Sequence, residues 1–400
     1  MSFAVILKSL DDKALGKLAA KVPSWNGVSV EVPASLNLQQ CSGESAARYK
    51  ASVVPSGSRV ADLTGGLGVD SWAFSLGASA VWYNERNVVL KEAVARNFAA
   101  LGVSNVVFNG YDIALAATDW QDALRAFGPD VIYLDPARRD AAGRKLFLLE
   151  DCSPDVVSLM PLLLELAPLV MVKVSPMADI TMLQRRLSGW LSELHVVGAE
   201  GECKELLCLC RRNAVFAGIT LAEDGFVLPD SGSASQDLPP KDFAPSGLIP
   251  PTVIRSSSES ELSSALRITA GPSRSRGHGR PRSSEASPAS ATTESGNQLL
   301  FVPSAAMVKS GLGPGMCVMP FNERLIHFGK YWQVIENLPF ASSQLKELGR
   351  RFPQADVTAR GVPISSEELR RRLGCKPGGS IHIFACTLSA DRRLLICHPA

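Results

Sequence analysis

The sequence lacks the closely spaced cysteine pairs that zinc sites and redox motifs need. Nine cysteines are spread over 400 residues without a CxxC pair. Three of them, Cys203, Cys208 and Cys210, fall on a run with the pattern of a strand. We therefore expect reduced thiols in a cytoplasmic protein, with neither disulfides nor a bound metal.

The chain also has no strong charge excess and no long uninterrupted apolar run. Its net charge of +2 indicates no particular partner by itself. The most hydrophobic stretch, from Val156 to Val172, carries Glu165 and two prolines, so we expect a buried helix and a strand there instead of a membrane span. The N-terminal FAVIL segment is too short for a signal peptide. We expect a soluble protein that is not exported and has no membrane partner.

The sequence does contain a strand that ends in an acid and runs into a glycine-rich turn. VADLTGGLGVD, from Val60 to Asp70, precedes a segment, SWAFSLGA, with the apolar spacing of a helix. Gly65, Gly66 and Gly68 let the backbone approach a ligand because they have no Cβ. Asp62 ends the strand where parallel sheets bind ligands. The turn predicts a nucleotide site, and the absence of a following lysine excludes the P-loop mode of ATP binding.

Two cofactors compete for this turn. Gly66, Gly68 and Ser71 nearly satisfy the GxGxxG fingerprint of NAD sites, with Glu85 as the acid about twenty residues further on. Asp62 favours S-adenosylmethionine (SAM) instead. An acid at this position would accept from the ammonium group of SAM but would repel the pyrophosphate of NAD. SAM is the predicted cofactor, and NAD stays open as the alternative.

The ends of the next two strands supply the other expected contacts of a SAM site. AVWYNER ends near Glu85, which is placed to accept hydrogen bonds from the two ribose hydroxyls. SNVVFNGYD leads to Asp112, which is placed to accept from the adenine amino group. Solvated acids at strand ends are the alternative interpretation of both. The predicted cofactor-binding residues are Asp62, Thr64, Gly65, Gly66, Gly68, Glu85 and Asp112.

A second turn, in PDVIYLDPARRD, is the predicted catalytic site. VIYL has the pattern of a buried strand, and DPAR forms a stiff turn at its carboxyl end, where substrates lie beside the cofactor. Methyl transfer from a sulfonium needs a nucleophile held in line at near-attack distance. Asp135 would accept a hydrogen bond from the atom to be methylated, and Pro136 would fix the turn. Ala137 and Arg138 complete the DPAR turn, and Arg138 would contact a phosphate or stack on a base. The alternative interpretation is that Asp-Pro only begins an ordinary loop.

These motifs resemble those of known methyltransferases. VADLTGGLGVDSWAFSLGASAVWYNER is similar to the motif of small-subunit rRNA guanine-N2 methyltransferases. QCSGESAARYK, DPARRDAAGRKLFLLEDCSPDV, VKVSPMADI and GECKELL resemble a bacterial family of class I SAM-dependent methyltransferases with a C-terminal THUMP-like domain. The resemblance covers residues from about 30 to 215 and from about 299 to 400. It implies a methyltransferase that acts on RNA.

One position departs from the pattern of enzymes that methylate base amino groups. Those enzymes usually carry an aromatic residue at the fourth position of the turn, where this chain has Arg138. DPAR also resembles the turn of uracil-C5 methyltransferases, which add a catalytic cysteine at the end of the fifth strand. This chain has Ser175 and Pro176 there, so Cys152 is interpreted as structural. We predict methylation of a base nitrogen in rRNA or tRNA. The alternatives are a methyltransferase for protein or small molecules, a non-catalytic SAM- or RNA-binding scaffold, and an NAD-dependent oxidoreductase.

The C-terminal region is rich in basic residues although the whole chain is nearly neutral. A clustered basic surface beside a methyltransferase domain is expected where RNA phosphates dock, and solvated helix faces are the alternative. The resemblance to THUMP-like domains implies the same role, so RNA is the predicted partner. The basic residues are Lys346, Arg350, Arg351, Arg360, Arg370, Arg371, Arg372 and Lys376.

The expected fold class is α/β, with a Rossmann-like, seven-stranded class I methyltransferase domain over residues 41–217. A helical lead-in over residues 1–40 precedes it, and Ser42 is predicted to cap the helix that follows. LSELHVVGA and KELLCLCRRNAVFAG are predicted to pair as antiparallel strands. Residues 218–298 are expected to form a low-complexity linker, disordered from about residue 230. Residues 299–400 are expected to form a small α+β domain, THUMP-like or ferredoxin-like, that binds RNA.

Overall fold

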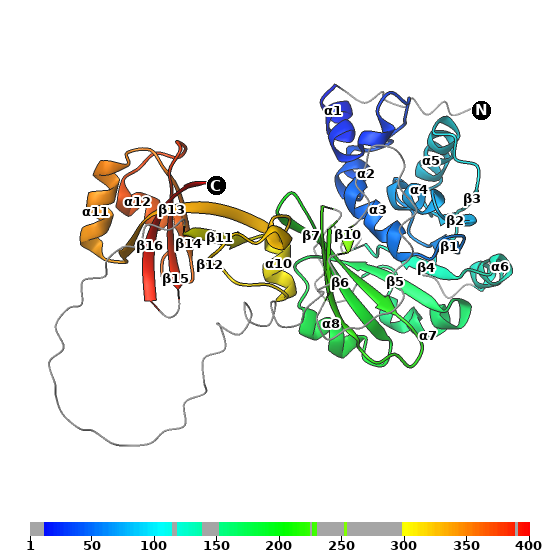
Figure 1. Ribbon diagram of the computed structural model, residues 1–400. Coiled ribbons are helices and arrows are strands. Elements are labelled where there is room, and N and C mark those ends of the chain that lie inside the picture. Colours follow the sequence, from blue (N-terminus) through cyan, green and yellow to red (C-terminus); the bar gives the residue numbers. More distant parts are fainter. Residues whose placement is uncertain are drawn as a thin grey trace, which may run out of the picture. The chain divides into compact units, whose positions relative to one another are not determined.

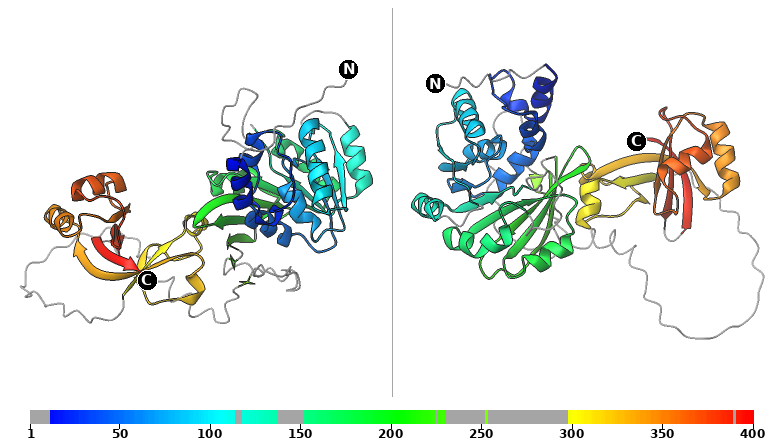
Figure 2. Two further views of the ribbon diagram at one scale, coloured as in Figure 1. Left: turned by 90° about the horizontal axis from the view of Figure 1, so that it is seen from above. Right: turned by 180° about the vertical axis from the view of Figure 1, so that it is seen from behind.

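The computed structural model describes residues 12–113, 118–137, 152–224, 226–229, 252–253, 298–388 and 391–400. They fall into two compact units, residues 1–254 and residues 255–400, each with its own sheet and hydrophobic core (Figures 1 and 2). Arg138 and most of the predicted linker lie outside the described residues. None of the helices in the described ranges is long and apolar enough to cross a membrane.

The first unit is built on one ten-stranded sheet. Its strands are β1 (Arg59–Asp62), β2 (Ala80–Asn84), β3 (Val106–Asn109), β4 (Val131–Leu134), β5 (Leu169–Val174), β6 (Leu191–Ala199), β7 (Glu202–Cys210), β8 (Gly218–Glu223), β9 (Phe226–Pro229) and β10 (Thr252–Val253). They lie in the order β10-β9-β8-β6-β7-β5-β4-β1-β2-β3. β1 to β5 pair in parallel, whereas β7 runs antiparallel to both β5 and β6.

The apolar strands occupy the centre of this sheet. Every side chain of β4 is buried, as are the first four of β5, which is typical of strands covered on both faces. The parallel core and the reversed β7 confirm the predicted Rossmann-like fold and the antiparallel final pair. The sheet is wider than the seven predicted strands, because β8 adds in parallel to the outer edge of β6 and buries Leu221 and Ala222.

Helices cover both faces of the sheet. They are α1 (Asp12–Lys21), the 3-10 helix η1 (Pro23–Trp25), α2 (Ser35–Gln40), α3 (Glu44–Val53), α4 (Val69–Ser75), α5 (Val88–Ala100), α6 (Asp119–Phe127), α7 (Val156–Leu166) and α8 (Ile180–Arg186). α3, α4 and α5 lie on one face, and α7 and α8 lie on the other (Figure 1). The predicted helical lead-in is present as α1, η1 and α2, and Trp25 of η1 packs edge-on against Trp72 of α4.

The predicted cap of α3 is wrong. The N-cap residue of α3 is Gly43, and no side chain caps the helix. The Ser42 hydroxyl instead donates to Oδ2 of Asp70 over 2.8 Å. Asp70 is buried, and a buried carboxylate needs hydrogen-bond donors. The Ser42 hydroxyl therefore bonds to Asp70, 28 positions away, and does not cap the neighbouring helix α3.

The second unit is a small α+β domain, as predicted. Its strands are β11 (Leu299–Pro303), β12 (Cys317–Met319), β13 (Gly329–Pro339), β14 (Asp356–Arg360), β15 (His382–Leu388) and β16 (Asp391–Pro399), in the order β12-β11-β13-β16-β15-β14. Its helices are α10 (Ala305–Ser310), the 3-10 helix η2 (Glu323–Leu325), α11 (Ser342–Arg351) and α12 (Ser366–Leu373). Leu345 and Leu348 of α11 and Leu369 of α12 share a core with β14, β15 and β16.

Candidate active site

A cleft of about 1980 Å³ opens in the first unit around the carboxyl ends of β1, β2, β4 and β5. This is the edge at which open parallel sheets bind ligands. Nine of the eleven predicted site residues line the cleft. They are Thr64, Gly65, Gly66, Gly68, Glu85, Asp112, Asp135, Pro136 and Ala137. Of the other two, Asp62 lies behind the glycine-rich turn and Arg138 falls outside the described residues.

The glycines of the turn meet needs of the protein itself. A Cβ on Gly65 would lie 2.2 Å from the ring of Tyr83, and one on Gly68 would lie 2.7 Å from Val94. Gly66 and Gly68 have φ values of +53° and +81°, which favour glycine. The Tyr83 hydroxyl donates to the carbonyl of Gly66 over 2.6 Å. The turn is therefore held tightly against β2 and presents its backbone to the cleft.

Asp62 braces this turn from behind. Its side chain is buried, with Oδ1 accepting from the Thr64 amide at 3.0 Å and Oδ2 accepting from the Ser71 hydroxyl at 2.6 Å. Burial raises the pKa of Asp62 to about 7, because the charged carboxylate loses its hydration. The geometry gives Asp62 a part in shaping the turn and joining it to α4. Direct contact between Asp62 and the ammonium group of a cofactor stays a prediction.

The two acids predicted to bind the ribose and the adenine lie at the ends of neighbouring strands. Oε2 of Glu85 accepts from the Gly66 amide at 3.1 Å, and Oε1 accepts from the Asn87 amide at 2.8 Å. Asp112 forms an ion pair with Arg86 at 3.5 Å, at the partly exposed rim of the cleft. Both acids face the cleft next to the turn, and their roles towards a ligand stay predictions.

Asp135 is the point at which the two predicted turns meet. Its backbone amide donates to Oγ1 of Thr64 over 2.6 Å, so the glycine-rich turn and the DPAR turn are joined directly. Pro136 is buried, and Ala137 forms a backbone bridge with Ser153. Cys152, interpreted from the sequence as structural, lies among the residues that line the cleft. The Asp135 side chain is 32% exposed and forms an ion pair with Lys173.

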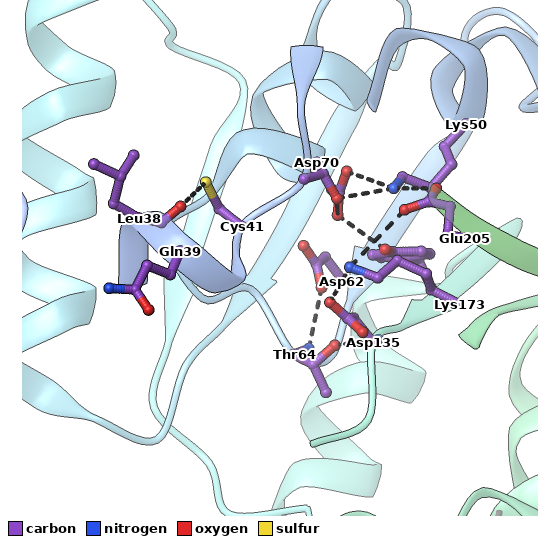
Figure 3. A network of polar contacts seen from close by, with 12 residues as sticks. Leu38, Gln39, Cys41, Lys50, Asp62, Thr64, Asp70, Asp135, Lys173 and Glu205 are labelled. Carbon is purple, nitrogen blue, oxygen red and sulfur yellow. Dashed lines mark hydrogen bonds and ion pairs between the residues drawn. The ribbon is translucent and has the colours of Figure 1, made fainter. Parts of the chain in front are cut away.

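The sequence-based prediction missed a network of buried charges beneath Asp135 (Figure 3). Lys50 of α3 is fully buried, and its Nζ lies 2.6 Å from Oε1 of Glu205 and 3.1 Å from Oδ1 of Asp70. Lys173 at the end of β5 contacts Asp135 and lies 4.0 Å from Oε2 of Glu205. We refer to Lys50, Asp70, Asp135, Lys173 and Glu205 as the charge network.

The charges in this network stabilise one another. Burial acts to lower the pKa of Lys173, but the carboxylates of Asp135, Glu205 and Asp70 outweigh it and raise the pKa. Burial likewise acts to raise the pKa of Asp70, yet the ammonium groups of Lys50 and Lys173 hold it below its ordinary value. Lys173 therefore stays protonated and Asp70 stays ionised around neutral pH.

A signal for part of the network was present in the sequence. Lys173 is the one charged residue of LVMVKV, and Glu205 stands just before the apolar run LLCLC. A charge in a buried strand requires a partner. Lys50 carried no such signal, because lysine is an ordinary residue on a helix.

The described residues contain no group of three or more His, Cys, Asp or Glu that would hold a metal ion. In the second unit, part of the predicted basic surface is paired with acids. Arg351 pairs with Glu336, and Arg371 and Arg372 both pair with Glu368. Arg350, Arg360 and Lys376 are exposed.

Comparison with known proteins relates both units to methyltransferases. Residues 329–399 match the family described as THUMP domain-like. The C-terminal unit therefore contains a THUMP-like domain. The solved structure of a candidate methyltransferase from Porphyromonas gingivalis W83 is 25% identical, with a TM-score of 0.67 over 98% of this chain and 93% of that chain. The methyltransferase-like first unit together with the THUMP-like domain confirms the predicted family.

Other solved structures match smaller parts of the chain. A candidate methyltransferase from Streptococcus mutans in complex with SAH is 12% identical, with a TM-score of 0.31 over 42% of this chain and 95% of that chain. Trm5b from Pyrococcus abyssi is 11% identical, with a TM-score of 0.31 over 46% of this chain and 53% of that chain. Likeness at this level adds nothing to the fold already described. No curated protein matches the chain in sequence.

Proposed function

We propose that this protein is a SAM-dependent methyltransferase that methylates a base nitrogen in RNA. The observation that carries the proposal is the hydrogen bond from the Asp135 amide to Thr64, which joins the two turns within one cleft. A cofactor bound along the glycine-rich turn would have its reactive end beside Asp135. Such an arrangement favours group transfer between two ligands held side by side.

The charge of the cleft favours SAM over NAD. Among the described residues, nine acidic and seven basic side chains line the cleft. SAM carries a net positive charge through its sulfonium and ammonium groups, whereas the pyrophosphate of NAD is negative, so the acidic excess suits SAM. The backbone of residues 65–68 would face the methionine end. Glu85 and Asp112 would accept from the ribose and adenine, since each carboxylate oxygen has more than one lone pair.

The chain's own residues would then orient the substrate. When bound, SAM supplies an electrophilic methyl group on its sulfonium. Asp135 would accept a hydrogen bond from the N–H of the substrate base and so align the nitrogen lone pair with the methyl carbon. Transfer would join the methyl carbon to the substrate nitrogen and break its bond to sulfur, which would keep the electron pair, and Asp135 or water would accept the proton of the nitrogen.

RNA as the substrate class is supported by the THUMP-like domain and its basic side chains. Arg350, Arg360 and Lys376 are exposed and available for phosphates.

Calorimetry and a methylation assay test the proposal. We expect the protein to bind SAM and not NAD, and to transfer labelled methyl groups to bulk RNA from cells that lack it. Asp135→Ala should abolish transfer while SAM binding persists. Asp122→Ala, which changes an exposed acid of α6, is the matched control and should retain full activity. NAD binding without SAM binding would overturn the cofactor, and wild-type activity in Asp135→Ala would overturn the site.

A further inference from the structure

We propose that Lys173 is a positioning residue that fixes and polarises the Asp135 carboxylate for the substrate nitrogen. The inference rests on the proposed methyl transfer and goes beyond it, because it gives a task in the reaction to a residue that does not touch the substrate. It follows from the placement of Lys173 behind Asp135 and from the network that holds Lys173 in turn (Figure 3).

The register of the sheet brings the two residues together. β4 and β5 pair in parallel with Leu134 opposite Val172, so Asp135 and Lys173 each lie one residue further along their strands. Nζ of Lys173 contacts Oδ2 of Asp135. The Lys173 side chain is only 11% exposed, whereas that of Asp135 is 32% exposed. Both residues line the cleft, but the ammonium group is the more deeply buried of the two charges, so the carboxylate is the one more open to the cleft.

Lys173 is itself held in place from behind. Its Nζ lies 4.0 Å from Oε2 of Glu205, and the other oxygen of Glu205 accepts from Lys50 at 2.6 Å. Lys50 also donates to Ser42 at 2.9 Å, so it is anchored on several sides. This chain of contacts from α3 through β7 to β5 leaves Lys173 little freedom. A group held in this way fixes its partner more precisely than a mobile surface lysine would.

The fixed cation acts on Asp135 in two ways. It holds Oδ2, which sets the orientation of the whole carboxylate, and its positive charge polarises that carboxylate. Since Lys173 remains protonated, it does not serve as a base. During transfer the nitrogen forms its bond to the methyl carbon as the carbon–sulfur bond breaks, and Asp135 accepts the hydrogen bond from the N–H throughout. Removing Lys173 should therefore impair the chemical step and leave cofactor binding unchanged.

Three variants separate this role from a purely structural one. Lys173→Met should lower kcat by about 100-fold, the loss expected when a reacting group is misplaced by about 1 Å. The KM for RNA should stay close to the wild-type value, because the proposed loss lies in the chemical step and not in substrate binding. Lys173→Arg keeps the charge and should restore much of the wild-type kcat. SAM affinity, measured by calorimetry, should be the same in all of them.

The double variant Lys173→Met/Glu205→Gln removes the lysine together with the acid behind it. If Lys173 only neutralises the buried Glu205, this variant should recover both thermal stability and the wild-type rate, which would overturn the inference. We expect stability to recover while kcat stays low. A wild-type kcat in Lys173→Met, with Asp135→Ala inactive, would overturn the inference alone. If the wild-type protein does not bind SAM, that result would instead overturn the proposed function, and with it the role of Lys173.

Discussion

Replacing Lys50 with Met probes the energetic basis of the site. Lys50 is fully buried between Glu205 and Asp70, and Met keeps nearly the same length and shape without the charge. Without this ammonium group, two buried carboxylates face each other with one cation, Lys173, remaining near them. We expect a large loss of stability because unpaired buried charges lack both hydration and a counterion.

The size of the loss follows from this burial. Removing one partner of a buried ion pair costs about 3–5 kcal/mol. For a unit of this size each kcal/mol lowers Tm by about 2–4 °C. Multiplying the energy range by the change in Tm per kcal/mol gives a Tm for Lys50→Met that is roughly 6–20 °C below that of the wild-type protein. Lys17→Met, which changes an exposed lysine of α1, should stay within about 0.5 kcal/mol of wild type.

The pH dependence gives the sharper test. The lysines hold the pKa of Asp70 below its ordinary value of 3.8. A carboxyl with a lowered pKa in the folded state contributes stability above its unfolded value, and this contribution is lost as pH falls through the lowered value. The gap between wild type and Lys50→Met should therefore be full at pH 7 and should narrow as the pH falls below about 4, because Asp70 becomes neutral.

Urea denaturation of both proteins at a series of pH values measures this gap. The triple variant Lys50→Met/Asp70→Asn/Glu205→Gln removes the charges together and should recover most of the lost stability. A Lys50→Met protein as stable as wild type at pH 7 would refute the reasoning. So would a triple variant that is no more stable than Lys50→Met.

Three further predictions address other parts of the molecule. Burial raises the pKa of Asp62 from 3.8 to about 7, so its charge destabilises the fold increasingly as pH rises from about 4 to above 7. In urea denaturation, Asp62→Asn should therefore gain stability relative to wild type over that pH range. A stability difference that does not change with pH would contradict this. Met177 lines the cleft and is 86% exposed, whereas Val215 is 87% exposed and does not line it. If the substrate base enters the cleft beside Met177, Met177→Asp should raise the KM for RNA severalfold and Val215→Asp should not. Equal effects of the two substitutions would argue against a contact between Met177 and the base. Reversing the charges of Arg370, Arg371 and Arg372 should weaken RNA binding. It should also reduce the slope of log K against log salt concentration by about 0.7–0.9 for each phosphate that is no longer neutralised. Filter binding at several salt concentrations would show an unchanged slope if these arginines do not contact phosphates.

Local chemistry made both turns of the cleft predictable. Glycine preferences and the Asp-Pro pair act over a few residues, so VADLTGGLGVD and DPAR could be placed at strand ends without tertiary information. The side-chain direction of Asp62 could not be predicted in the same way. Its carboxylate points to Ser71 of α4, and that orientation depends on how the helix packs on the sheet.

The sequence by itself determined the strand–turn–helix units and, with them, the edge of the sheet at which a cofactor and a substrate would meet. Only the tertiary structure decided what supports that edge. Lys50 and Glu205 are 155 positions apart, and their pairing depends on how α3 packs against the sheet. Buried charges cost too much to exist alone, but local propensity does not encode which distant charge compensates them. The identity of Lys173 as the partner of Asp135 therefore emerged only when β4 and β5 were aligned in register.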